Sequence, residues 1–192
     1  MKPRTPSAHL ALMLAAQTEA ASERYLKLIY AGGVFHDAAR VSAERLGRGE
    51  RGYTLMPNAY GGEWSLVLGS GADLMTNKVH LTYLGGDQTL AHNLARSGPT
   101  IGKLMARLSS GAATSCFQLS AERLPALKSW VEASVKSGAQ GDVNAERRFG
   151  PLRVQVLTSR REQQADVDVL LWRGGLVGST GEMPRPHLEF SS

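Results

Sequence analysis

The sequence has only one cysteine, Cys116, in a chain of 192 residues. A single thiol excludes an internal disulfide framework and any zinc cluster built from several cysteines. We expect Cys116 to be a small buried thiol, because nothing around it is typical of a nucleophile. The histidines lack metal-site spacing, so the sequence predicts no metal and no other cofactor. They are His9, His36, His80, His92 and His187.

Aromatic residues are scarce at 6% of the chain, but apolar residues reach 42% and charged residues 20%. The last two values are ordinary for a globular protein and argue against disorder in the body of the chain. A chain of this length can form one good core and is short for two. We therefore expect a single domain over residues 1–172, followed by a tail over 173–192 that is rich in glycine, serine and proline.

Long hydrophobic runs are also missing, and none approaches the roughly 20 residues that a membrane-spanning helix needs. The basic start, Met1 to Arg4, and the apolar stretch Ala8 to Ala16 have the outline of a secretory signal. We favour an uncleaved N-terminus, because the apolar stretch is short, contains His9 and continues into a helical pattern. The sequence therefore predicts a cytoplasmic protein without a membrane span, which agrees with its low cysteine content.

Acidic residues are absent from one stretch, 88–111, which carries Arg96, Lys103 and Arg107. The whole chain has a formal net charge of +5. A modest positive excess favours a polyanionic partner such as a nucleic acid.

The spacing of apolar residues predicts the secondary structure. Helical periodicity, ended by glycines, covers residues 8–30, 34–46, 88–109 as a pair, and 121–136, where Pro125 favours a start nearer Leu124. Alternation predicts strands over 63–68, 78–84 and 113–119, and a hairpin of 152–156 with 167–171 around the loop 159–164. Residues 45–52 and 137–148 read as loops.

This pattern predicts an α+β fold. Two N-terminal helices would pack with an antiparallel sheet that contains hairpins, and further helices would cover one face of the sheet. Strand runs broken by helices favour hairpins over a doubly wound parallel sheet.

The residues from Gln88 to Leu108 carry the most specific motif of the chain. Small and apolar residues follow one another at fixed offsets, at Ala91, Ala95, Ile101 and Leu104. This arrangement resembles the helix-turn-helix of bacterial repressors, including the lactose-repressor type, over about 20 residues. The resemblance implies a non-enzymatic protein that binds DNA.

The resemblance also implies roles for five polar side chains. Ser97 would cap the second helix and contact phosphate together with the helix N-terminus. Thr100 and Lys103 would face base edges or phosphates in the major groove. Arg96 and Arg107 would contact the DNA backbone.

Three features depart from the repressor pattern. Arg96 occupies a turn position that is usually apolar, and Gly98 and Gly102 fall in the supposed recognition helix. Each glycine lowers helix propensity by roughly 1 kcal/mol relative to alanine. The plain alternative is two short amphipathic helices packed on a sheet.

A second motif, Asp166-Val-Asp168, resembles the acidic strand of the polymerase-β-like nucleotidyltransferases. Carboxylates at positions i and i+2 lie on one face of a strand and would share Mg²⁺. The nearest equivalent of that family's phosphate-binding turn, 149–151, has proline in place of serine, and Glu189 would have to supply the third carboxylate. The alternative is the solvent face of an amphipathic strand.

Three functional hypotheses follow. The first is a non-enzymatic DNA-binding or nucleic-acid-associated bacterial protein that uses 88–108. The second is a structural or partner-binding subunit of a larger bacterial assembly, bound to another protein or to further copies of itself. The third is a metal-dependent nucleotidyltransferase-like enzyme that uses Asp166 and Asp168. We expect a protein without catalytic activity.

Overall fold

The computed structural model describes residues 8–47, 49–58, 61–70, 76–86, 100–161 and 164–173. Seven strands form one antiparallel sheet in the order β1-β2-β3-β4-β7-β6-β5. The strands are β1 (Phe35–Arg40), β2 (Glu50–Pro57), β3 (Glu63–Ser70), β4 (Thr76–Gly86), β5 (Val143–Phe149), β6 (Leu152–Arg161) and β7 (Gln164–Arg173). The helices are α1 (Ala8–Ala31), α3 (Ile101–Ser115) and α4 (Leu124–Ser137), with short 3₁₀ turns η1 (Ala43–Arg45) and η2 (Ala121–Arg123).

The sheet joins two meanders. Strands β1 to β4 follow one another as neighbours, and so do β5 to β7. The last strands of the two meanders, β4 and β7, pair over nine residues at the centre. The first strands of the two meanders, β1 and β5, therefore form the two outer edges of the described sheet.

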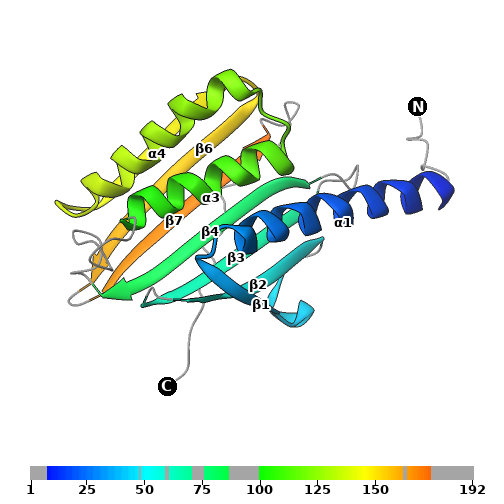
Figure 1. Cartoon of the computed structure of the whole chain (residues 1–192), viewed down its shortest axis with the longest axis horizontal. Helices are drawn as coiled ribbons and strands as arrows, with labels where there is room; N and C mark the ends of the chain where they lie inside the picture. The colour runs from blue at the N-terminus through cyan, green and yellow to red at the C-terminus, as the bar shows by residue number, and fades with distance from the viewer. Residues whose placement is uncertain are drawn as a thin grey trace.

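The three helices lie side by side over one face of the sheet, with α3 between α1 and α4 (Figure 1). None of these three helices lies on the opposite face, which we call the open face. Among the described residues, helices thus cover one sheet face and not the other, and this asymmetry explains the alternation of buried and partly exposed residues along the central strands.

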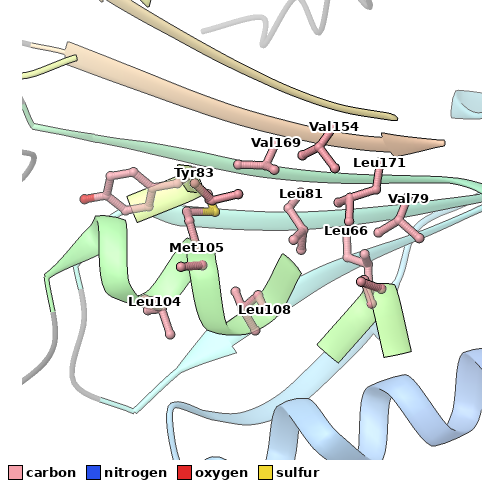
Figure 2. Close-up of a cluster of buried hydrophobic side chains, with 14 of the residues drawn as sticks. Leu66, Val79, Leu81, Tyr83, Leu104, Met105, Leu108, Val154, Val169 and Leu171 are labelled. Atoms are coloured by element: carbon pink, nitrogen blue, oxygen red, sulfur yellow. The ribbon is translucent and has the colours of Figure 1, made fainter. Parts of the chain in front are cut away.

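The core forms between α3 and the covered face. Met105 of α3 points at the alternating apolar residues of the central strands (Figure 2). Leu104 and Leu108 lie on the side of α3 that faces Tyr25 and Ile29 of α1. The strand residues beneath the helices are all buried; they include Leu66, Val79, Leu81, Tyr83, Val154, Val169 and Leu171. Because burial follows the period of two, the central strands are the part of the fold that sequence alternation predicts best.

Polar side chains on the open face bond to one another across the strands. Lys78 and Glu50 form an ion pair at 3.1 Å above Gly69, which pairs with both of them and has no side chain to obstruct the contact. Gln155 donates to Asn144 at 2.9 Å. Such cross-strand pairs stabilise a sheet face that carries no helices.

The predicted architecture is wrong in its N-terminal half. Only one helix precedes the sheet, because residues 34–46 form β1 and the turn η1 instead of a second helix. Gly33 adopts φ +67° directly after α1 and redirects the chain. Phe35 then packs edge-on against Trp64 at 5.3 Å between ring centroids, and this tertiary contact overrides the helical period.

Three other predicted segments differ from the structure. Residues 113–119 form the end of α3 and a turn, 137–148 contain most of β5, and 45–52 contain the start of β2. The helix over 8–30, the strands over 63–68 and 78–84, the hairpin and the start of α4 at Leu124 are confirmed. Apart from Arg173, the last residue of β7, the predicted tail over 173–192 lies outside the described residues.

Candidate functional site

Helix α3 contains the second half of the predicted helix-turn-helix. Thr100 caps it by accepting a hydrogen bond from the backbone amide of Lys103 at 3.3 Å. Lys103 and Arg107 are exposed and lie one turn apart on the same stripe. The structure therefore brings three of the five predicted residues together. Arg96 and Ser97, with the rest of the motif before Thr100, lie outside the described residues.

The surroundings of α3 explain two residues of the motif. A Cβ on Gly102 would lie 3.1 Å from the carbonyl oxygen of Glu132, so glycine allows α3 and α4 to approach closely. A Cβ on Gly32 would lie 2.6 Å from Nη2 of Arg107, which places this guanidinium at the C-terminal end of α1. A positive charge is favourable there. Both residues thus serve helix packing, and DNA contact by α3 stays a prediction.

Asp166 and Asp168 lie together on the open face of β7, but both make contacts within the sheet. Oδ1 of Asp168 lies 2.8 Å from Nε2 of His80 and accepts a hydrogen bond from Thr82 at 2.8 Å. Oδ2 of Asp166 accepts a hydrogen bond from Ser159 at 3.3 Å. The contacts of Asp168 link the two meanders of the sheet, because Asp168 belongs to β7 and both His80 and Thr82 belong to β4.

The described part of the chain brings no three His, Cys, Asp or Glu side chains together as a metal site. The third carboxylate of the nucleotidyltransferase resemblance, Glu189, lies outside that part. Gly150, in the supposed phosphate-binding turn, has φ +63° and makes the tight connection between β5 and β6. Cys116 is buried, and burial raises the pKa of its thiol to about 12, so it is not a thiolate at neutral pH.

The hairpin of β5 and β6 carries the densest positive charge in the described residues. Residues 143–161 contain a single acidic side chain, Glu146, and five arginines: Arg147, Arg148, Arg153, Arg160 and Arg161. Dividing the chain into long segments hides this excess, because nearby acidic residues of 112–142 and 162–192 balance it. A shorter window would have found the hairpin.

The arginines of the β5–β6 hairpin differ in their acidic partners. Arg148 and Arg153 are paired directly opposite each other on the open face. The only carboxylate between them, Glu146, bonds to Arg153, whose Nε donates to Oε1 at 2.7 Å. Like charges directly opposite in a sheet are unfavourable. The site therefore holds two guanidinium groups and one carboxylate, and Arg148 has no acidic partner in the described ranges.

Arg147 lies on the covered face of the same strand. Its Cζ is 5.5 Å from the centroid of the Phe149 ring, and that ring packs against Trp130 of α4 at 5.8 Å. This contact holds the guanidinium at the rim of the sheet. Arg147 is exposed and forms no ion pair with any residue that the structure describes. Within the described part of the chain, adjacent residues thus present positive charges without an acidic partner on opposite faces of β5.

The backbone of β5 is a regular edge. All seven of its residues pair with β6 without a register shift, and β6 is its only strand neighbour in the described sheet. A strand at the end of a sheet leaves every second amide and carbonyl without a ladder partner. The β5 edge, meaning Val143–Phe149 with Arg147 and Arg148, is therefore our candidate functional site.

Fold and site together define a sheet covered on one face by helices, with a basic strand at the edge of the described sheet. No family model, curated protein or solved structure matches this chain.

Proposed function

We propose that this chain is a non-enzymatic partner-binding subunit that recruits another protein by strand addition to the β5 edge. The observation that supports it best is the unbroken seven-residue pairing of a strand whose other side has no strand neighbour in the described sheet. An extended segment can satisfy such an edge with main-chain hydrogen bonds, while its side chains provide specificity. We include a cytoplasmic location in this proposal; no described helix is long and apolar enough to cross a membrane.

Proline substitutions test the role of the β5 backbone. The amides of successive residues in a strand point in opposite directions, so one of Asn144→Pro and Ala145→Pro removes an outward amide and the other removes a ladder hydrogen bond. We expect the outward variant to keep the circular dichroism spectrum and unfolding midpoint of the parent. The inward variant serves as the control that marks which amide belongs to the ladder.

The partner is represented by nine-residue peptides selected on the parent protein from a random display library. We expect these peptides to slow amide hydrogen exchange in β5 and to lose binding to the outward proline variant. Peptides that bind this variant as tightly as the parent, or a library that gives no binder, would refute strand addition at β5.

A second candidate function is nucleic-acid binding by the segment that includes α3. It is favoured by Lys103 and Arg107, which are exposed one turn apart in the acid-free stretch. The expected contacts are Thr100, Lys103 and Arg107, together with Arg96 and Ser97. Duplex DNA should then bind with a steep salt dependence, and Lys103→Glu with Arg107→Glu should abolish it. Unchanged binding by that double variant would remove this candidate.

A further inference from the structure

We infer that the segment added to β5 is acidic, with two consecutive carboxylates placed opposite Arg147 and Arg148. This inference rests on the proposed strand addition and specifies its partner. The argument starts from the charge balance of the hairpin, which has five arginines and one glutamate over residues 143–161.

Position along the strand makes the requirement specific. Arg148 lies on the open face opposite Arg153, which already holds the carboxylate of Glu146. The other side of Arg148 is the outer edge, so a new neighbouring strand would place a side chain directly beside its guanidinium. A carboxylate there would supply the negative charge that this face lacks.

On the covered face, Arg147 requires a second carboxylate, next to the one expected beside Arg148. Arg147 precedes Arg148, and the side chains of consecutive strand residues point to opposite faces. An antiparallel strand beside β5 therefore places two consecutive residues next to Arg148 and Arg147, one on each face. Glu146 is occupied by Arg153 and does not require a basic partner. The expected segment is a β-forming sequence with an adjacent pair of acids.

The helix that packs nearest to β5 carries small side chains on both sides of Trp130. On α4, Trp130 contacts Phe149 beneath it. By helical spacing, Ala126 and Ala133 lie on the same side as Trp130, and both are small and exposed. An added strand would therefore meet only small side chains on either side of Trp130.

Two synthetic peptides test this inference on the full chain. The acidic probe is acetyl-Thr-Val-Thr-Glu-Glu-Val-Thr-Val-amide, and its matched probe carries Gln-Gln in place of Glu-Glu. We expect the acidic probe to bind about tenfold more tightly at low salt in fluorescence anisotropy, because two exposed charge pairs form. The preference should shrink as added salt screens both pairs.

Protein variants locate the preference. Arg147→Gln with Arg148→Gln should bind both probes equally. Lys128→Gln with Lys136→Gln removes the same charge from exposed positions of α4 and should keep the preference. Equal loss in both double variants would mean that only net charge matters, and would overturn the inference.

Other outcomes separate the inference from the proposed function. If both probes bind equally, yet slow exchange in β5 and fail on the outward proline variant, strand addition stands and the acidic preference falls. If neither probe binds at millimolar concentration while a single-stranded or duplex oligonucleotide binds through Arg147 and Arg148, the edge serves a nucleic acid and the inference is wrong.

Discussion

The two edge strands of this sheet, β1 and β5, differ in the regularity of their pairing and in the contacts of their polar side chains. The β1 edge has a register shift between Phe35 and Asp37, and Oδ1 of Asp37 accepts a hydrogen bond from the amide of Ala38 at 2.7 Å. The β5 edge has no register shift and carries two arginines that have no acidic partner among the residues that the structure describes. Bulges and inward-turned polar groups are common protections of a sheet edge. One edge is thus closed by its own side chains, whereas the other keeps its main chain in register and its charges unsatisfied.

The difference shows that a free edge needs more than an end position in the sheet. Both strands end the sheet, and each is anchored on the covered face by a phenylalanine. Only β5 combines a regular backbone with charge that the fold leaves unbalanced. Charged side chains can also protect an edge strand from aggregation. Separate substitutions of the buried anchors, of the hydrogen-bonding groups and of the charges therefore distinguish the two edges.

The largest expected effect comes from removing the two anchors. Phe35 is 1% exposed, whereas Phe149 is 5% exposed. Phe35 also contacts Trp64, whose ring centroid lies 4.6 Å from that of Tyr83. Phe35→Ala should lower the free energy of unfolding by about 4 kcal/mol and Phe149→Ala by about 3 kcal/mol, measured by urea denaturation. Leu28→Ala, at a half-exposed position, is the control and should cost under about 1 kcal/mol. A larger cost at Phe149 would show that β5 is the better anchored edge.

The next effect concerns the ion pair between Glu50 of β2 and Lys78 of β4, which lies in the half of the sheet that ends at β1. Burial raises the pKa of Glu50, but hydrogen bonds from Lys78 and the Gly47 amide and the Lys78 charge lower it more, so the net shift is downward. The stabilisation is therefore present above the unfolded pKa and is lost as the pH falls through the folded pKa. Glu50→Gln should cost about 1 kcal/mol at pH 7, after solvent screening, and progressively less in acid.

Unfolding of this variant and of its parent across pH 3 to 7 measures the effect. Glu44→Gln, at an exposed position of η1, is the matched control and should leave the pH profile unchanged. A constant difference between Glu50→Gln and parent at all pH values would contradict the assignment.

The same contrast explains how far the sequence predicts this fold. Val79, Leu81 and Tyr83 alternate with polar residues, and this pattern predicts a central strand because one face of the strand is buried and the other is partly exposed to solvent. In β5 the only apolar residues are Val143, Ala145 and Phe149. Arg147 occupies the remaining inward position, between Ala145 and Phe149, and therefore breaks the period of two. Sequence patterns report burial, and edges are the least buried strands.

The candidate site was missed for the same physical reason. Four of the seven β5 residues are polar, including Arg147 on the covered face, and the sequence of this strand therefore resembles a loop. The predicted motif before Thr100 lies outside the described residues, while Lys103 and Arg107 lie on the exposed stripe of α3. Their surroundings depend on α1 and α4 packing against α3, which no local pattern contains.

A smaller effect is expected from opening the β1 edge. Asp37→Ala removes the acceptor for the amide of Ala38 and should cost about 0.5 kcal/mol of unfolding free energy. Hydrogen exchange at Ala38 should become faster, which NMR can follow at this single amide. Asp37→Asn keeps an oxygen acceptor and should preserve slow exchange. If Asp37→Ala exchanges as slowly as its parent, Asp37 does not protect this edge.

The smallest effect is the most specific to the β5 edge, because its sign opposes the usual cost of a substitution. Arg148→Gln removes a positive charge that lies opposite Arg153. It should therefore raise the free energy of unfolding by about 0.3 kcal/mol at low salt. Arg153→Gln breaks the pair with Glu146 and should destabilise it by a similar amount. Both differences should shrink at high salt, in urea unfolding of the two variants side by side. If Arg148→Gln destabilises the protein as Arg153→Gln does, the fold already satisfies Arg148. If instead it stabilises the fold while losing the acidic probe, the edge keeps an unfavourable charge that serves binding rather than folding.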